Sequence, residues 1–122
     1  MRHPLSNRGI PFLGGLLAVS LLTTIAGCGS ASEINAVPET SLVVDVRTPS
    51  EFKDWHYPGA INVPVQVLEK KLDTLGDKHR AIIVYCRSGN RSSAAKQILI
   101  DAGFTDVKNG GGLNDMRRFA KP

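Results

Sequence analysis

Apolar segments alternate with turn signals between residues 41 and 119, and this pattern predicts strands and helices in alternation. Residues 41–46 and 81–85 are apolar runs, rich in β-branched side chains, whose length suits buried strands. Residues 81–85 are apolar throughout, so we expect them to form a central strand of a parallel sheet. Residues 60–63 and 104–108 carry weaker strand signals.

Helix signals occupy the intervals between these runs. Thr48-Pro49-Ser50-Glu51 is a capping box with proline at the first helical position, which predicts a short helix to about Asp54. Further helices are predicted at 65–75, 92–102 and 113–119, where apolar residues recur at helical spacing or a glycine marks the end. The glycines at 110–112 are expected to form a loop. Together the elements indicate an α/β domain with helices on both faces of a parallel sheet.

The first residues of the chain have the layout of an export signal. Arg2 and Arg8 give a basic start, no acidic residue precedes Glu33, and residues 10–25 are mostly apolar. This run is shorter than the roughly 20 residues that a membrane-spanning helix needs. It ends in Ile25-Ala26-Gly27-Cys28, which resembles a bacterial lipobox, in which the cysteine accepts diacylglycerol before cleavage.

The lipobox predicts a division of the chain into three parts. We expect a signal peptide at 1–27, an acylated Cys28 with a tether to residue 40, and a domain at 41–122. Acyl chains would anchor the protein in the bacterial cell envelope, facing the periplasm. Gly29 stands where an aspartate would favour the inner membrane, so the resemblance to lipoproteins favours the outer membrane. An ordinary secretory signal or an uncleaved anchor is the alternative.

Charge and cysteine content narrow the chemistry of the mature domain. Removal of residues 1–27 leaves 13 Lys and Arg against 11 Asp and Glu, a net charge of +2, with no long basic run. We therefore expect no nucleic-acid partner. Cys28 and Cys86 are the two cysteines, and acylation would occupy the first. Cys86 would then be a single thiol in an oxidising compartment, either buried and inert or exposed for a reason.

The residues that follow Cys86 favour a reactive thiol. Cys86 ends the predicted central strand, and Arg87-Ser88-Gly89-Asn90-Arg91 leads to the helix predicted from Ser92. Ligands bind at the carboxyl ends of parallel strands, and a helix N-terminus favours negative charge. Gly89 and Asn90 tolerate left-handed backbone, so the loop can turn its amides inward. We expect a thiol of lowered pKa that is open to solvent; the alternative is a small buried hydrophobic residue.

Three motifs together resemble those of the rhodanese-like domains. Cys86-Arg87-Ser88-Gly89-Asn90-Arg91-Ser92 is similar to the family's active-site loop. Asp45-Val46-Arg47 through Glu51, with the stretch from His56 to Pro64, is similar to its N-terminal signature, and the stretch from Val107 to Leu113 to its C-terminal motif. With its export signal, the chain most resembles single-domain periplasmic rhodaneses of the phage-shock protein E type. The resemblance implies a rhodanese-like three-layer domain with a central parallel sheet.

The same resemblance implies sulfur transfer by double displacement. The Cys86 thiolate would take sulfane sulfur from thiosulfate or a similar donor, and the persulfide would pass it to cyanide or a thiol. The loop from Arg87 to Ser92 would bind the substrate, and its arginines would hold the donor's oxygens or shape the loop. Asp45 would hydrogen-bond the loop with Arg47 nearby, or Asp45, Arg47 and Glu51 would only tie the first helix to the sheet. No metal or organic cofactor is called for, and we expect a monomer.

Two other functions share parts of this pattern. A sulfane-sulfur carrier that passes its sulfur to a protein partner, without efficient turnover, would use every residue named above. A phosphatase of the Cdc25 type or an arsenate reductase would use a Cys-x5-Arg loop. Arg91 stands five positions after Cys86, which gives the shorter Cys-x4-Arg spacing of the sulfurtransferases.

Overall fold

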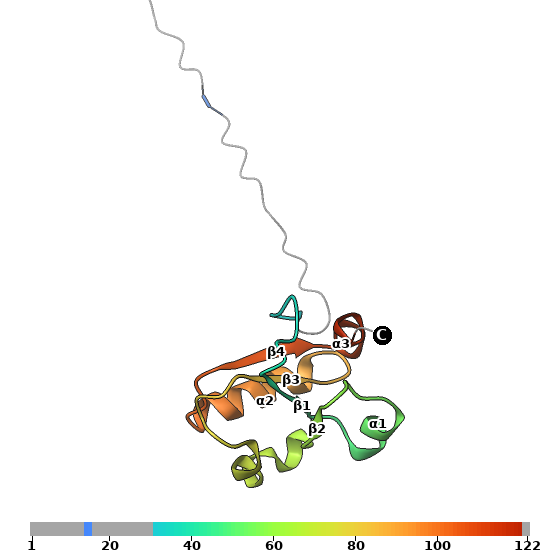
Figure 1. Cartoon of the computed structure of the whole chain (residues 1–122). Helices are drawn as coiled ribbons and strands as arrows, with labels where there is room; N and C mark the ends of the chain where they lie inside the picture. Colours follow the sequence, from blue (N-terminus) through green and yellow to red (C-terminus); the bar gives the residue numbers. More distant parts are fainter. Residues whose placement is uncertain (1–13, 16–30, 121–122) are drawn as a thin grey trace, which may run out of the picture.

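A computed structural model describes residues 14–15 and 31–120 of the chain (Figure 1). The predicted signal peptide and Cys28 therefore lie outside the described residues, apart from positions 14 and 15. The elements run in the order β1 (Leu42–Asp45), α1 (Pro49–Asp54), β2 (Ile61–Asn62), η1 (Val65–Lys70), η2 (Leu72–Leu75), β3 (Ile82–Tyr85), α2 (Asn90–Asp101), β4 (Val107–Gly111) and α3 (Leu113–Phe119). Within the described ranges, no helix is both long and apolar enough to cross a membrane.

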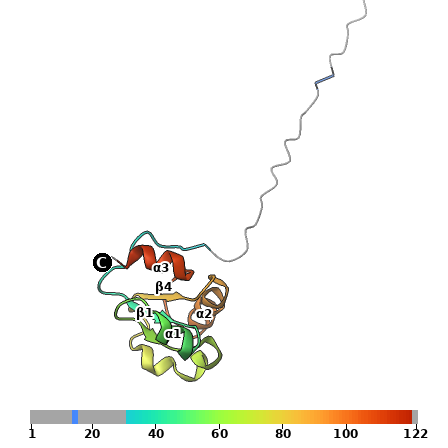
Figure 2. The same ribbon diagram turned by 90° about the vertical axis from the view of Figure 1, so that its right-hand side faces the viewer.

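The sheet is parallel and four-stranded, in the order β2-β1-β3-β4, so the predicted central position of β3 is confirmed. The β1–β3 pairing sets Leu42 opposite Ile82 and Asp45 opposite Tyr85. Helices lie on both faces, with α2 and α3 on opposite sides of the sheet (Figures 1 and 2). The expected three-layer α/β architecture is therefore confirmed.

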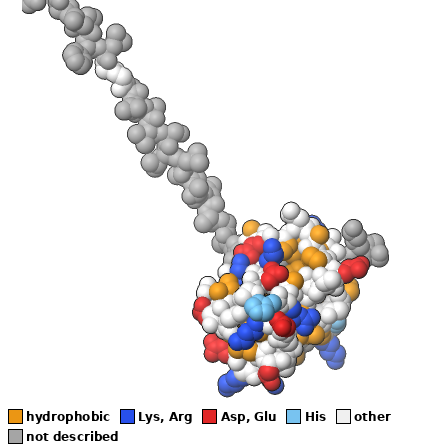
Figure 3. Space-filling model, turned by 60° about the vertical axis from the view of Figure 1, so that its left-hand side comes forward, with side chains coloured by type: hydrophobic (Ala, Val, Ile, Leu, Met, Phe, Trp, Pro, Cys, Tyr) orange, Lys and Arg blue, Asp and Glu red, His pale blue; other side chains and the backbone are white. Residues whose placement is uncertain are grey.

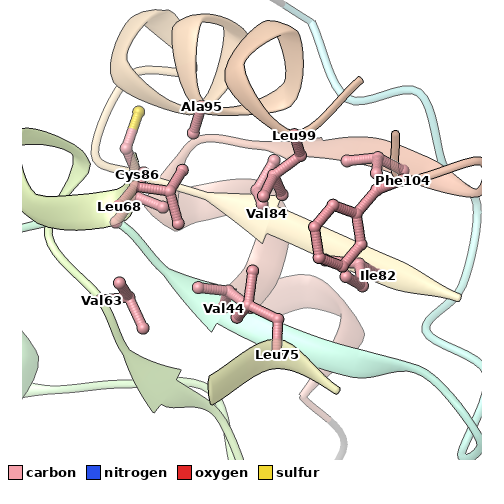
Figure 4. Packing of buried hydrophobic residues seen from close by; sticks show 12 residues of the cluster. Val44, Val63, Leu68, Leu75, Ile82, Val84, Cys86, Ala95, Leu99 and Phe104 are labelled. Carbon is pink, nitrogen blue, oxygen red and sulfur yellow. The ribbon is translucent and has the colours of Figure 1, made fainter. Parts of the chain in front are cut away.

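Alternation along the strands produces two apolar clusters, one on each face of the sheet. On one face, Val44 and Val84 pack with Leu99 of α2 and with the leucines of η1 and η2 (Figure 4). On the other face, Val43, Ile83 and Tyr85 pack with Met116 of α3, and Phe52 of α1 packs against them. The apolar positions of β1 and β3 thus bury both faces at once, which explains their nearly continuous hydrophobic runs.

The single helix predicted at 65–75 is wrong. Two short 3-10 helices, η1 and η2, occupy this stretch and are separated by Lys71, whose φ of −121° and ψ of 17° leave the helical region. Pro64 precedes η1 and provides no side-chain cap. Leu68 and Leu75 are nevertheless fully buried, so the apolar spacing identified the inward positions correctly. Packing of these leucines holds the segment in place, because 3-10 hydrogen bonds are too poor to do so alone.

The last strand lies later in the chain than predicted. β4 spans Val107–Gly111 rather than 104–108, so Gly110 and Gly111, expected in a loop, belong to the strand. Gly111 pairs with Tyr85 of β3, and Gly110 lies where the register between the two strands shifts. A Cβ at Gly110 would lie 2.8 Å from Met116 Sδ and 2.9 Å from Ile83 Cγ2. The close approach of α3 to the sheet therefore requires glycine here, although glycine is a weak strand former.

Candidate active site

The candidate site is the loop from Cys86 to Gly89, between the end of β3 and the start of α2. The backbone N–H of Cys86 donates to the carbonyl of Gly111 at 3.2 Å, and Leu113 N–H donates to the carbonyl of Arg87 at 3.0 Å. The loop is therefore tied to the β4–α3 connection. Gly89 has φ +91° and lets the chain turn directly into α2, which begins at Asn90 and not at Ser92 as predicted. Asn90, also expected to tolerate left-handed backbone, does not use it.

The sulfur of Cys86 accepts hydrogen bonds from this turn. The Gly89 N–H lies 3.0 Å from Sγ, and the Ser92 hydroxyl lies 3.4 Å from it. Burial raises the pKa of Cys86. Hydrogen bonds from the Ser92 hydroxyl and from the backbone N–H groups of Ser92, Ser88 and Gly89 lower the pKa, and their combined effect is larger than that of burial. The net pKa is below that of an ordinary thiol, because these donors stabilise the thiolate more than burial disfavours it.

The expectation that Cys86 is open to solvent is wrong. Its exposed fraction is 0 %, and it lies at the edge of the aliphatic cluster that includes Val84 and Leu99. In Figure 4 its sulfur points away from the aliphatic side chains of that cluster. Burial without hydrogen bonds would indicate an inert core cysteine. The N–H of Gly89 and the hydroxyl of Ser92 instead give the sulfur polar neighbours.

Asn109 is a site residue that the sequence reasoning missed. It is 3 % exposed, and its Oδ1 accepts from the Ser92 hydroxyl at 2.7 Å and from the Gly111 N–H at 2.8 Å. Its Nδ2 donates to the Gly89 carbonyl at 3.3 Å. Asn109 thus connects β4 to both residues that contact the Cys86 sulfur. The signal available in the sequence was its place, two residues after the apolar Val107, on the inward side of the strand.

Arg91 is held by Glu51 of α1. Its two terminal nitrogens donate to the two carboxylate oxygens at 2.9 and 3.0 Å. The pair lowers the pKa of Glu51 to about 2, chiefly through the hydrogen bond from Arg91. Thr48 caps α1 by accepting from the Glu51 N–H at 3.3 Å, and its hydroxyl contacts Glu51 Oε1 at 3.2 Å. The Glu51 carboxylate binds Arg91 and not the Thr48 N–H that a capping box would use. Arg91 therefore shapes the site by joining α1 to α2.

Asp45 and Arg47 form a buried ion pair beside the loop. Arg47 Nη2 lies 2.6 Å from Asp45 Oδ2, and the Tyr85 hydroxyl donates to the same oxygen at 2.7 Å. Arg47 also donates to the Trp55 carbonyl at 2.6 Å. The expected hydrogen bond from Asp45 to the loop is therefore wrong. Asp45 and Arg47 tie α1 to the sheet, as the alternative held, whereas Glu51, the third residue of that alternative, pairs with Arg91 of α2. Burial outweighs every other influence on Tyr85 and raises its pKa.

A cavity of about 270 Å³ opens beside the loop. It is lined by Arg87 of the loop, by Trp55 at the end of α1 and by Leu113 and Arg117 of α3. The Arg117 guanidinium carbon lies 5.2 Å from the centre of the Trp55 ring. Arg87 and Ser88, the two residues after Cys86, are exposed. This cavity is therefore where a small molecule can approach the loop.

The segment before β1 lies against the sheet near the site. The Glu33 N–H donates to the Asn109 carbonyl at 2.8 Å, and the Asn109 N–H donates to the Glu33 carboxylate at 2.8 Å. The Lys96 ammonium also contacts this carboxylate, at 2.7 Å. Ile34 and Val37 pack on the cluster around Met116. The predicted tether is therefore docked on the domain over its described part.

Charged side chains of both signs are intermixed on the face drawn in Figure 3. Within the described ranges, no three His, Cys, Asp or Glu side chains are grouped so that they could hold a metal ion.

Comparison with known proteins places this geometry in a family. The model of the family described as rhodanese-like domain matches residues 30–116. The thiosulfate sulfurtransferase PspE of Escherichia coli is 40 % identical over 74 residues, which are 60 % of this chain and 71 % of that protein. A sulfurtransferase of Allochromatium vinosum is 34 % identical over 94 residues, covering 76 % and 87 % of the two chains. A solved structure described as a rhodanese with anions from E. coli is 39 % identical, has a TM-score of 0.60, and is matched over 62 % of this chain and 89 % of that one.

Proposed function

The chain belongs to the rhodanese-like family and transfers sulfur by rhodanese-type chemistry, and we propose that it takes this sulfur from thiosulfate or a similar donor as a persulfide on Cys86. The observation that carries the proposal is the hydrogen bonding of Cys86 Sγ, which accepts from the Gly89 N–H at 3.0 Å and contacts the Ser92 hydroxyl at 3.4 Å. Such preorganised donors stabilise a sulfur anion without further rearrangement.

The reaction proceeds in two displacements. The Cys86 thiolate attacks the sulfane sulfur of thiosulfate, an S–S bond forms, and the bond to the sulfonate sulfur breaks. Its electron pair leaves with sulfite, and the terminal persulfide sulfur is left as an anion. A nucleophilic acceptor, cyanide or a thiol, then attacks that outer sulfur, and the bonding pair returns to Cys86 as the thiolate. No metal or redox cofactor enters this electron balance.

Each loop residue has a role in this scheme. Ser88, Gly89 and Ser92 direct hydrogen-bond donors at the sulfur. Arg91, neutralised by Glu51, holds α1 against the start of α2, where Asn90 begins the helix. Arg87 is exposed and faces the cavity through which the donor arrives. Because Cys86 is fully covered, the proposal requires that the donor displace some of the atoms that cover it.

A steady-state assay tests this function. Thiocyanate formation from thiosulfate and cyanide should proceed with many turnovers and be absent in Cys86→Ser. The matched control is Ser93→Ala, a substitution at an exposed position on α2. Turnover that persists in Cys86→Ser would contradict the proposal.

The full burial of Cys86 also favours a second candidate, a sulfur carrier, because a covered persulfide is protected from small acceptors. Carrier function predicts one stoichiometric transfer from thiosulfate, no sustained thiocyanate formation, and discharge to a protein partner. The Cys-x4-Arg loop continues to argue against a phosphatase or arsenate reductase. An aryl phosphate or arsenate turned over by the wild type would favour that class instead.

We also propose that the mature protein is a monomer held in the bacterial cell envelope through an acylated Cys28, facing the periplasm. The proposal rests on the sequence Ile25-Ala26-Gly27-Cys28 at the end of an apolar run. Metabolic labelling with a radioactive fatty acid should label the wild type and fail to label Cys28→Ala. Fractionation of the envelope would show whether the outer membrane receives the protein. Equal labelling of both proteins would contradict lipidation at Cys28.

A further inference from the structure

Two arginines beside the loop differ from their neighbours in having no carboxylate partner among the described residues. Asp45 neutralises Arg47, Glu51 neutralises Arg91, and Asp115 binds Arg118. Arg87 and Arg117 form no such pair within residues 31–120. Both line the same cavity of about 270 Å³, although one follows β3 and the other lies on α3.

Arg117 contacts an aromatic ring at the C-terminal end of α1. Its guanidinium carbon lies 5.2 Å from the centre of the Trp55 ring, a distance at which a cation is attracted to the ring face. The Arg117 side chain is otherwise exposed, and the contact with Trp55 favours a position of its guanidinium group at the cavity. The acidic side chains that also line the cavity are Glu51, which is held by Arg91, and Asp54, which is exposed on α1.

Building on the proposed sulfur transfer, we infer that Arg117 binds the donor and, with Arg87, holds the oxyanion end of an anionic sulfane-sulfur compound in this cavity. Guanidinium groups match oxyanions because their N–H donors are planar and fixed in direction. Arg87 is the residue after Cys86. When its guanidinium group holds the oxygens of the donor, the sulfane sulfur at the other end of the donor lies near the Cys86 loop. The sequence predicted this role for Arg87 and Arg91, but Arg91 forms an ion pair with Glu51.

The consequence is selectivity for charge. A dianionic donor gains from both guanidinium groups, whereas a neutral reagent of the same size does not. Loss of the Arg117 charge should therefore weaken the binding of anionic ligands and leave the binding of neutral ligands unchanged. Arg118 provides a matched control, since it is the next residue on the same helix and its charge is paired with Asp115.

Binding can be measured without turnover by the fluorescence of Trp55, the single tryptophan of the chain. In the full-length chain carrying Cys86→Ser, thiosulfate should bind about tenfold more weakly when Arg117→Gln is added, the order expected for the loss of one charge-assisted contact. Adding Arg117→Lys should weaken it less, because the charge remains. Adding Arg118→Gln should change nothing.

A second measurement does not depend on sulfur transfer. Iodoacetate and iodoacetamide alkylate the same thiol and differ mainly in charge, and mass spectrometry of the Cys86 peptide gives both rates. The ratio of the iodoacetate rate to the iodoacetamide rate should fall several-fold in Arg117→Gln and stay unchanged in Arg118→Gln, since only the anion is attracted.

Equal thiosulfate affinities with and without Arg117→Gln, or no thiosulfate binding at all, would overturn the assignment. An unchanged alkylation ratio would overturn it as well. The two proposals fail separately: a lowered ratio in Arg117→Gln, together with no persulfide on wild-type Cys86, would support the anion site and refute the sulfur transfer.

Discussion

Replacing Ser92 by alanine removes the hydroxyl that lies 3.4 Å from the Cys86 sulfur. The single proton of this hydroxyl has three acceptors within reach, at Cys86, at the Gly89 carbonyl (3.0 Å) and at Asn109 Oδ1 (2.7 Å). When Cys86 is a thiolate, the proton can turn to the sulfur. When Cys86 carries its own proton, the hydroxyl can donate to Asn109 and accept from the thiol. Ser92 is therefore suited to both protonation states but stabilises the thiolate.

The size of the effect follows from the geometry. A hydrogen bond to a charged group contributes about 1.5–3 kcal/mol, and a long contact to sulfur belongs at the low end of that range. Since about 1.4 kcal/mol corresponds to one pKa unit, Ser92→Ala should raise the pKa of Cys86 by about one unit. The free energy of unfolding should change by no more than about 1 kcal/mol, because the former partners of the hydroxyl retain other hydrogen bonds. Asn109 Oδ1 still accepts from the Gly111 N–H, and the Gly89 carbonyl still accepts from Asn109 Nδ2.

The assay is the rate of iodoacetamide alkylation at Cys86 as a function of pH, followed by mass spectrometry. The rate rises with the thiolate fraction, so its midpoint reports the pKa. Wild type should show a midpoint below the ordinary value of about 8.5, and Ser92→Ala should shift it upward. Ser93→Ala, at the next and exposed position, is the control. A midpoint that is the same in both variants would refute the role assigned to the Ser92 hydroxyl.

Two further predictions concern the framework around the site. Gly110→Ala should destabilise the domain by about 1–3 kcal/mol through overpacking, since the added methyl would lie 2.8 Å from Met116 Sδ and 2.9 Å from Ile83 Cγ2; chemical denaturation measures this, and an unchanged midpoint would contradict it. The Glu51–Arg91 pair should contribute stability above about pH 4.5 and lose it as the pH falls toward about 2, because the folded-state pKa of Glu51 is lowered. Both side chains are partly solvated, so this contribution is at most about 1 kcal/mol, and Glu51→Gln should remove it; an identical acid dependence in wild type and variant would disprove the pairing.

Much of the fold could be predicted because local signals and packing agree. The apolar runs of β1 and β3 are buried on both faces, and the glycine motif places the start of α3 at Leu113, as expected. The prediction failed where tertiary contacts outweigh local preference. Lys71 interrupts a regular apolar spacing. β4 continues through Gly110, a weak strand former, which is present because α3 leaves no room for a side chain at this position.

The site was predicted in its chain position but only partly in its contacts. Arg91 and its partner Glu51 are 40 residues apart, so no local pattern connects them. Asn109 comes from the neighbouring strand, and its link to Ser92 depends on the register between β4 and the end of β3. The sequence left burial of Cys86 as the alternative and could not decide for it, because a loop sequence defines its donors without defining what covers them.

The most direct test is the intact mass of the mature protein, measured after treatment with thiosulfate and removal of the excess donor. The account predicts a gain of one sulfur atom, located by peptide mapping at Cys86, reversed by cyanide and absent in Cys86→Ser. An unchanged mass after thiosulfate, or a sulfur adduct of equal yield in Cys86→Ser, would contradict it.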